Sequence, residues 1–225
     1  MLYLYNKIAM TFNIKEYQKI QGFIKKNTNK HCKIIAISKN HPLSSVVEAL
    51  NCGIKVFGEN RVQEAQEKFE KIKGENKDIE LHLTGPLQTN KVKSALMLFD
   101  VFHTLDREKL AREFKKNKDA IQNKKFFIQL NTGAEETKSG VYVSEADRFI
   151  EYCKKDLGLN IEGLMCIPPI KDDPNEHFLL LKNIAKKNKL NELSMGMSDD
   201  YEKGVLSGAT CVRVGTKLFG VRNAN

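Results

Sequence analysis

The sequence predicts an α/β protein with a single (β/α)₈ TIM barrel, and three observations support this fold class. Eight short apolar runs rich in β-branched residues recur along the chain, and stretches with helical periodicity separate them. Strands that alternate with helices form parallel βαβ units. Several of the runs are apolar throughout, as strands covered on both faces are. A length of 225 residues is also ordinary for one barrel of this kind.

The expected strands and helices alternate along the whole chain. The strands are expected over residues 33–37, 55–57, 79–84, 101–103, 126–131, 161–167, 192–194 and 211–214. The helices between them are expected over residues 43–50, 61–73, 89–98, 107–116, 144–155, 174–189 and 199–206, with a short one at 216–220. The second and seventh strands are very short. If either failed to form, an open flavodoxin-like or Rossmann-like sheet would replace the barrel.

An extra helix around residues 14–26 is expected before the first strand, so the predicted barrel domain covers residues 11–225. Residues 1–10 are predicted to be an N-terminal extension. They are apolar in part, but Lys7 interrupts them and no small-residue cleavage site follows, which argues against a signal peptide. Met10 is an alternative start. No stretch approaches the roughly 18 apolar residues of a membrane span.

Composition favours a cytoplasmic protein with neither a metal site nor a nucleic-acid partner. The five cysteines are odd in number, widely spaced and without a C-x-x-C pair, which is typical of a reducing compartment. The net charge is +9, but the lysines are scattered over helical stretches among asparagine and glutamate. No aromatic-basic module accompanies them, so solvated helix faces explain the charge better than nucleic-acid binding does. We expect a monomer that does not bind membranes.

Lys39 is the first candidate functional residue, because it directly follows the first strand. Active sites of these barrels lie at the C-terminal ends of the strands. Partial burial lowers the pKa of a lysine, and a neutral amine can condense with a carbonyl group. Taken alone, Lys39 is explained as well by a side chain that reaches solvent from a strand end.

The last two strands are followed by glycine- and hydroxyl-containing loops. Ser198 follows the seventh strand, and Gly215 and Thr216 follow the eighth. Phosphate sites of these barrels form in the same two loops, on free backbone N–H groups at a helix start. Ser198 is also a good helix N-cap, and the two roles can coexist.

Arg213 lies within Cys-Val-Arg-Val-Gly, where a solvent-facing position is hard to find. A buried guanidinium needs an acceptor, either an acidic side chain or a ligand. An amine, a phosphate cradle and a guanidinium together indicate a phosphorylated carbonyl compound. Pyridoxal 5′-phosphate satisfies all three, with its aldehyde on Lys39, its phosphate on the two loops and its ring nitrogen on Arg213.

Seven motifs, in order, resemble the pyridoxal-phosphate homeostasis protein family, whose fold matches the N-terminal barrel of alanine racemase. They are IAISK at 35–39, FGENRVQE at 57–64, HLTGPLQTNK at 82–91, KSG at 138–140, GLM at 163–165, LSMGMSDD at 193–200 and VRVGT at 212–216 with FG at 219–220. The resemblance implies a Schiff base at Lys39, phosphate contacts from Ser198, Gly215 and Thr216, and a ring-nitrogen contact from Arg213. It also implies that Asn60 and His82 lie near the cofactor. Asn40-His41 and Arg61 depart from the family pattern without touching these contacts.

The expected function is non-catalytic: holding pyridoxal phosphate for intracellular vitamin B6 homeostasis, and delivering it to apo-enzymes. Racemisation needs an acid–base group on each face of the substrate carbon, and no tyrosine stands at an expected strand end to be the second. Tyr142 is near a loop but is explained equally well as a helix start. Three alternatives stay open: a pyridoxal-phosphate-dependent amino-acid racemase, a Schiff-base aldolase with Glu59 as acid–base, and nucleic-acid binding through the positive charge.

Overall fold

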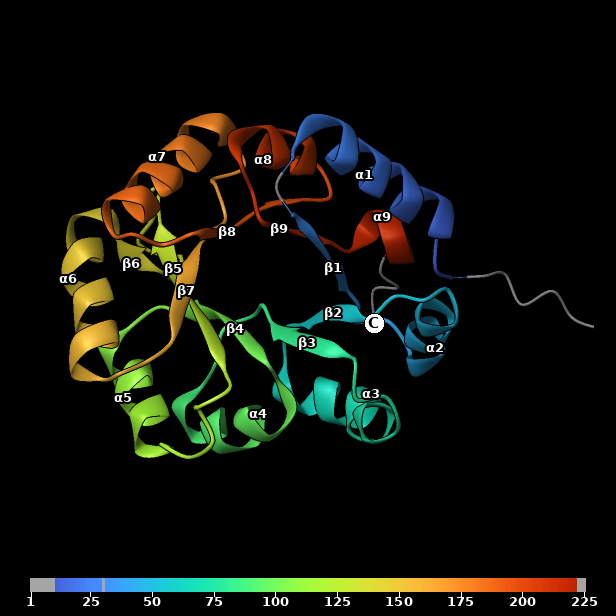
Figure 1. Cartoon of the computed structure of the whole chain (residues 1–225), viewed down its shortest axis with the longest axis horizontal. Coiled ribbons are helices and arrows are strands. Elements are labelled where there is room, and N and C mark those ends of the chain that lie inside the picture. Colours follow the sequence, from blue (N-terminus) through green and yellow to red (C-terminus); the bar gives the residue numbers. More distant parts are fainter. Residues whose placement is uncertain (1–10, 30, 222–225) are drawn as a thin grey trace, which may run out of the picture.

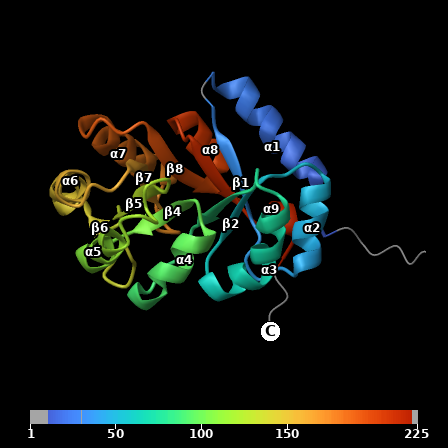
Figure 2. The ribbon, with the colours of Figure 1, turned by 60° about the horizontal axis from the view of Figure 1, so that its bottom comes forward.

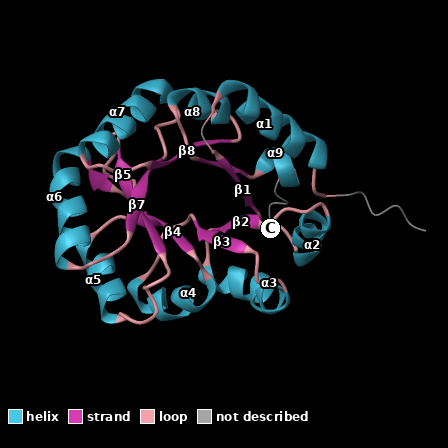
Figure 3. Ribbon diagram, in the orientation of Figure 1, coloured by secondary structure: helices cyan, strands magenta, loops and turns pink. Residues whose placement is uncertain are grey.

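In a computed structural model of the chain, eight parallel strands form a closed barrel with helices around its outside (Figure 1, Figure 3). The structure describes residues 11–29 and 31–221. The strands pair in the order β4-β3-β2-β1-β9-β8-β7-β5, and β4 pairs with β5 to close the ring. Their bounds are β1 (Lys33–Ile37), β2 (Val56–Glu59), β3 (Glu80–Leu83), β4 (Val101–Leu105), β5 (Lys125–Asn131), β7 (Ile161–Cys166), β8 (Glu192–Met197) and β9 (Cys211–Val214). The predicted barrel is confirmed, including its two shortest strands.

The helices around the barrel lie where periodicity predicts them. They are α1 (Ile14–Asn27), α2 (Leu43–Asn51), α3 (Val62–Glu75), α4 (Val92–Leu98), α5 (Glu108–Lys116), α6 (Ala146–Glu151), α7 (Pro174–Lys187), α8 (Tyr201–Ser207) and α9 (Thr216–Phe219). Two starts have side-chain caps: Asn13 accepts from the Glu16 backbone N–H, and Asp173 accepts from that of Asn175. Each cap satisfies a donor that the first helical turn leaves without a partner.

Two local features differ from the sequence prediction. A two-residue strand, β6 (Val141–Tyr142), pairs with β5 beside the barrel, and it is too short for an alternating pattern to indicate. The helix expected over residues 144–155 has three parts: a 3₁₀ turn (Val143–Glu145), then α6, then a π-helical turn (Tyr152–Asp156). The α-helical part buries Ala146, Phe149 and Ile150, the π-helical turn buries Cys153, and the 3₁₀ turn buries none of its residues. Hydrophobic periodicity predicts a helical segment here but does not distinguish these helix types.

The main apolar core lies between the strands and the surrounding helices, and a smaller cluster lies inside the barrel. Successive side chains of a strand point to opposite faces. On β9, Val212 and Val214 pack toward the helices, whereas Cys211 faces the interior cluster. Arg213 shares the face of Cys211, so its guanidinium enters the barrel interior, where it is 5% exposed.

The segment before α1 joins the two ends of the described chain, and α1 lies beside α8 and α9 outside the barrel (Figure 1, Figure 2). The Thr11 hydroxyl donates to Ser45 Oγ on α2 at 2.8 Å. The Phe12 ring lies 5.2 Å from that of Phe219 on α9. The predicted boundary at residue 10, the extension and the alternative start at Met10 lie outside the described residues. None of the described helices has the length and apolar character that crossing a membrane requires.

Candidate functional site

A cavity of about 240 Å³ lies at the C-terminal end of the strands, among the loops that follow β1, β2, β3, β7, β8 and β9. It brings together six of the seven residues that the sequence predicts as cofactor ligands. Its lining is Ile37, Lys39, Asn60, Thr84, Ile167, Met197, Ser198, Asp199, Arg213, Gly215 and Thr216. Lys39 and Arg213 come from opposite ends of the sequence and meet here because β1 pairs with β9.

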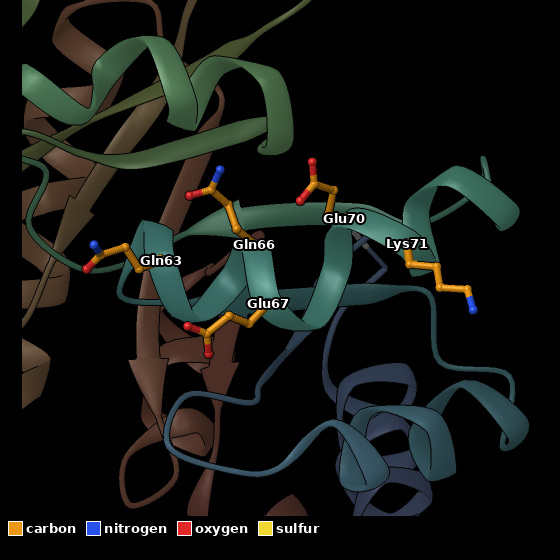
Figure 4. Close-up of a pocket in the computed structure, with 5 residues that line it drawn as sticks. All are labelled: Gln63, Gln66, Glu67, Glu70 and Lys71. Atoms are coloured by element: carbon orange, nitrogen blue, oxygen red, sulfur yellow. The ribbon is translucent and has the colours of Figure 1, made fainter.

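A larger hollow of about 630 Å³ lies on the outer surface of α3 and is not a candidate site (Figure 4). Figure 4 shows that one helix supplies the whole lining, namely Gln63, Gln66, Glu67, Glu70 and Lys71. Ligand sites enclose most of their ligand and combine apolar walls with a few convergent polar groups. A hollow along one polar helix face offers neither, so size alone does not identify the functional cavity.

The turn that carries Lys39 is held by its neighbours on both sides. The Ser38 backbone N–H donates to the Gly58 carbonyl at 3.0 Å, which continues the pairing of β1 with β2. Asn40 has a φ of 60°, and its backbone N–H donates to a Glu64 carboxylate oxygen on α3. Asparagine tolerates this left-handed conformation better than most residues. The half-buried Lys39 side chain therefore leaves the backbone at a fixed point of the cavity wall.

A buried ion pair supports this turn from the helix side. Lys68 of α3 lies 2.6 Å from Glu59, and their side chains are 6% and 0% exposed. The Lys68 ammonium also donates to the carbonyls of Ser38, at 2.8 Å, and His41, at 3.3 Å. The Ser38 hydroxyl donates to Glu59 at 2.7 Å. Burial raises the pKa of Glu59, and the adjacent Lys68 opposes that rise.

Glu59, the acid–base of the aldolase alternative, is thus engaged with Lys68 and Ser38 and does not line the cavity. Its strand explains this position. Gly58 faces Ile35 and Ile37 inside the barrel, so the next residue points outward to α3.

Asn60 is held at the cavity wall by the following strand. The Thr84 hydroxyl donates to Asn60 Oδ1 at 2.9 Å. Gly85 allows this approach, because a Cβ there would lie 2.4 Å from the Asn60 carbonyl oxygen and 2.6 Å from its Cα. Gly85 of the third motif therefore has a packing role, because it lets the loop after β3 lie against the end of β2.

The loops after β8 and β9 are joined at the predicted phosphate cradle. The Gly215 backbone N–H donates to Ser198 Oγ at 3.3 Å. Gly215 precedes the short helix α9, and its carbonyl accepts from the Leu218 and Phe219 backbone N–H groups. First-turn N–H groups of a helix have no acceptor within it. The two hydroxyls of Ser198 and Thr216 and these N–H groups form a cluster of donors suited to an anion.

Arg213 is held from inside the barrel by two neutral acceptors. Its Nη1 donates to Ser194 Oγ at 2.6 Å, and its Nη2 donates to the Cys166 carbonyl at 2.9 Å. Burial lowers the pKa of Arg213, but a guanidinium stays protonated in proteins. It carries five N–H donors, so further donors are available to a ligand in the cavity that Arg213 lines.

The structure does not bring His82 to this cavity, so it does not join the other six predicted ligands. His82 lines a separate cavity of about 170 Å³ at the N-terminal end of the strands, together with Lys33 and Glu80. Its two ring nitrogens lie 2.7 Å from His103 Nε2 and 2.7 Å from Glu80 Oε1. The residue faces the barrel interior as alternation predicts, but at the opposite level of the barrel.

Sequence reasoning missed several residues of the site. Asp199 and Thr84 line the cavity and stand inside the quoted motifs, so their position next to a strand end was a usable signal. Ile167 and Met197 supply apolar walls. Lys68 lies on the helix face of Ala65 and Phe69, and a lysine on a buried face indicates a buried partner. Nothing in its spacing indicates that the partner is Glu59.

Known proteins resemble this chain over most of its length. Residues 14–223 match the family model for the alanine racemase N-terminal domain. A protein of Aquifex aeolicus named pyridoxal phosphate homeostasis protein is 40% identical over 202 residues, which cover 84% of this chain and 87% of that protein. This chain belongs to the pyridoxal phosphate homeostasis protein family. The member from Haemophilus influenzae is 36% identical over 221 residues, 92% of each chain.

Solved structures agree with the family's fold. PipY of Synechococcus elongatus with pyridoxal phosphate bound has a TM-score of 0.77 at 30% identity, covering 90% of this chain and 99% of that chain. Alanine racemase from Acinetobacter baumannii has a TM-score of 0.72 at 18% identity, covering 93% of this chain and 62% of that chain. At that identity the racemase shows the fold alone. The family's barrel is therefore the racemase-like barrel that the sequence predicts.

Proposed function

We propose that this chain binds pyridoxal 5′-phosphate in the cavity at the C-terminal end of the barrel, as a Schiff base on Lys39, and holds it without turning over a substrate. The observation that carries the proposal is the convergence of an amine, a guanidinium and a hydroxyl-lined glycine loop on one cavity of about 240 Å³. The relatives support it, since PipY has been solved with pyridoxal phosphate bound and curated members are named for its homeostasis.

Each reactive part of pyridoxal phosphate has a matching group in the cavity. The Lys39 amine condenses with the aldehyde and releases water. Ser198, Gly215 and Thr216 would hold the phosphate through their hydroxyls and backbone N–H groups, and Arg213 would donate to the ring nitrogen. When bound, the cofactor supplies an electrophilic imine carbon. The protein supplies position and exclusion of water around it.

Two properties of the cavity bear on turnover, and the second of them argues against it. Racemisation needs proton transfer on both faces of the substrate carbon. Besides Lys39, the described lining offers one side chain able to act as a base, Asp199, and contains no Tyr, His or Cys. Tyr142, considered as the second base of a racemase, is 42% exposed on β6 and lies outside the lining. Arg213 keeps its protons, so the ring nitrogen beside it accepts a hydrogen bond and the ring is a weaker electron sink.

The first experiment measures the Schiff base directly. The purified protein with added pyridoxal phosphate is expected to be yellow, and borohydride reduction fixes the cofactor on Lys39, which peptide mass spectrometry locates. Lys39→Ala abolishes the visible band and the adduct. Lys91→Ala, a lysine of the loop after β3 outside the cavity lining, keeps both. Labelling at another lysine, or a band that survives in Lys39→Ala, would contradict the proposal.

A second experiment tests the absence of turnover. The loaded protein is incubated with L-amino acids in D₂O, and Cα deuterium and the D-isomer are measured. We expect no multiple turnovers. Repeated exchange with accumulation of the D-isomer would establish the racemase alternative instead.

We further propose that the loaded protein buffers a reactive aldehyde in the cytoplasm as a monomer and supplies it to apo-enzymes. The five cysteines are thiols and four of them are buried, which suits a reducing compartment. Transfer is tested by mixing the loaded protein with a cofactor-free transaminase and a trap for free aldehyde. Activation that persists in the presence of the trap supports direct delivery, whereas activation that the trap abolishes shows release into solution.

A further inference from the structure

A continuous chain of hydrogen bonds crosses the barrel interior from Arg213 to Glu80. Arg213 Nη1 donates to Ser194 Oγ at 2.6 Å, and Ser194 Oγ lies 2.9 Å from His103 Nδ1. His103 Nε2 lies 2.7 Å from His82 Nδ1, and His82 Nε2 lies 2.7 Å from Glu80 Oε1. The chain begins at the cavity of the proposed cofactor and ends at the cavity at the opposite end of the barrel.

The Glu80 end of this chain is a carboxylate. Lys33 donates to both of its oxygens, at 2.6 and 2.9 Å. The hydrogen bond from His82 and the neighbouring Lys33 lower the pKa of Glu80 to about 2. The Glu80 side chain is 29% exposed, so the end of the chain is in contact with solvent. His82 and His103 are fully enclosed at 1% and 0%.

A carboxylate only accepts hydrogen bonds, and this fixes every hydrogen along the chain. His82 must donate from Nε2 to Glu80, so a neutral His82 accepts at Nδ1. His103 must then donate from Nε2 and accept at Nδ1. The Ser194 hydroxyl therefore donates to His103 and accepts from Arg213. All the donors point the same way, from the guanidinium toward the carboxylate.

A charged imidazole would reverse part of this order, and the surroundings oppose it. Lys33 lies near one end of the chain and Arg213 lies at the other. Burial lowers the pKa of His82 and outweighs the opposing effect of the hydrogen bond and charge of Glu80. Burial together with the nearby His82 and Arg213 lowers the pKa of His103 further. The His103 ring also stacks on Phe127 at 4.5 Å, which leaves no water against that face.

The series of hydrogen bonds links the buried Arg213 guanidinium to a carboxylate. Buried guanidinium groups are normally paired with a carboxylate, yet both acceptors that hold Arg213 from inside the barrel are neutral. The charge of Asp200 also acts on Arg213, and Glu80 is the anion that the hydrogen-bonded network reaches. Hydrogen bonds aligned in one direction polarise one another in a low-dielectric interior, so the negative charge of Glu80 makes Ser194 Oγ a stronger acceptor for Arg213.

We propose that Glu80, His82, His103 and Ser194 are positioning residues that hold Arg213 as a hydrogen-bond donor toward the ring nitrogen of pyridoxal phosphate. The inference rests on the proposed function and extends it to the other end of the barrel. Under this inference His82 acts on the cofactor through Arg213 and does not contact it. Substitution at Glu80, across the barrel from the ligand, should therefore change the electronic state of the bound ring.

The first test needs no ligand. Long-range ¹H–¹⁵N NMR of the cofactor-free protein reports which ring nitrogen of each histidine carries a proton. We expect His82 and His103 to be neutral, with the proton on Nε2 in both. His177 lies on α7 and takes no part in this series of hydrogen bonds. The variant His177→Gln therefore identifies its NMR signals and separates them from those of His82 and His103. A proton on Nδ1 of His103, or a charged ring at either position, would overturn the inference even if every variant misfolded.

The second test compares Glu80→Gln with Glu192→Gln. Both residues line the same cavity, and Glu192 is outside the hydrogen-bonded chain. Glutamine keeps an acceptor for His82 but removes the charge. With ¹⁵N-labelled pyridoxal phosphate, Glu80→Gln should move the ring-nitrogen shift and raise the dissociation constant about tenfold, the order of one charge-assisted hydrogen bond. Glu192→Gln should leave both unchanged.

The two proposals fail in different ways. If the wild-type protein forms no borohydride adduct on Lys39, the proposed function fails, while the histidine measurement still decides whether the chain is ordered. If the adduct forms and the ring-nitrogen shift is the same in Glu80→Gln as in Glu192→Gln, the inference fails and the proposed function stands.

Discussion

Two lysine–glutamate pairs of equal length occupy the two ends of the barrel, and they differ in their exposure to solvent. At the C-terminal end, Lys68 and Glu59 lie 2.6 Å apart with side chains 6% and 0% exposed. At the N-terminal end, Lys33 and Glu80 also lie 2.6 Å apart, but are 33% and 29% exposed. Water screens the second pair and is excluded from the first, so one contact distance corresponds to different energies.

The two pairs have different structural roles at the two ends of the barrel. The enclosed pair fixes a backbone turn, because Lys68 also binds the carbonyls of Ser38 and His41 on either side of Lys39. The solvated pair fixes a charge, because Glu80 ends the chain that leads to Arg213. Removing a charge should therefore destabilise the fold at one end and alter the ligand's surroundings from the other.

Lysine-to-methionine substitutions at the two pairs should give the largest contrast. Lys68→Met leaves the Glu59 carboxylate buried without its partner, which costs about 3–5 kcal/mol of unfolding free energy. Lys33→Met breaks a partly solvated pair and should cost about 0–1 kcal/mol. Urea denaturation followed by circular dichroism measures both.

A double variant sharpens this contrast. Glu59→Gln added to Lys68→Met removes the isolated charge and should recover part of the lost stability. Equal losses for the two single methionine variants, or no recovery in the double variant, would show that burial does not set the energy of these pairs.

A smaller effect is expected from Gly85→Ala. The added methyl group would meet the Asn60 backbone at 2.4 Å, and forcing such an overlap costs about 1–3 kcal/mol. It should also displace Asn60 from the cavity wall and weaken pyridoxal phosphate binding. Gly74→Ala is the matched control, because that position in α3 has open space around it. Its stability should stay the same or rise by up to about 1 kcal/mol, measured by the same denaturation.

The smallest expected effect is the pH dependence that the two enclosed histidines give to the free energy of unfolding. Burial lowers the pKa of His82 and His103 in the fold, so both rings must lose a proton that the unfolded chain binds below about pH 6.5. Their stability contribution is present above that pH and is lost as pH falls. We expect a loss of about 1 kcal/mol between pH 7 and 6. A second loss should begin near the ordinary pKa of a glutamate and continue toward 2, where Glu80 is protonated.

His31→Gln is the control for this pH dependence of stability. His31 is exposed and lines the same cavity at the N-terminal end of the barrel as His82. His103→Gln should flatten the dependence above pH 6, whatever its absolute stability. A stability that rises on acidification through this range would mean that the rings are charged in the fold.

The sequence was sufficient for the strands and for the convergence of six candidate ligands on one cavity, because both depend on local pattern. Apolar runs mark the strands, and the residues after them lie at one end of a parallel barrel. His82 shows the limit. Leu81 and Leu83 of β3 pack in the outer core, so His82 between them lies on the inner face. Its height in the barrel depends on the stagger between neighbouring strands, which is a property of the closed ring.

Long-range pairing was the other quantity that sequence pattern could not supply. Lys68 interrupts the apolar face of α3, so its burial is readable, yet Glu59 and Ser38 reach it only through the packing of α3 on β1 and β2. The route from Arg213 to Glu80 likewise uses one residue from each of β9, β8 and β4 and two from β3. The spacing of these five residues in the sequence does not indicate that they form one series of hydrogen bonds.

The pairing of β1 with β9 joins the first and last barrel strands to be synthesised. Lys39 emerges early from the ribosome, whereas Arg213, Gly215 and Thr216 emerge near the end. A nascent chain therefore has the amine long before it has the anion cradle, and cannot retain the ligand until the ring has closed. By mass action, a ligand that spans this junction stabilises the closed state.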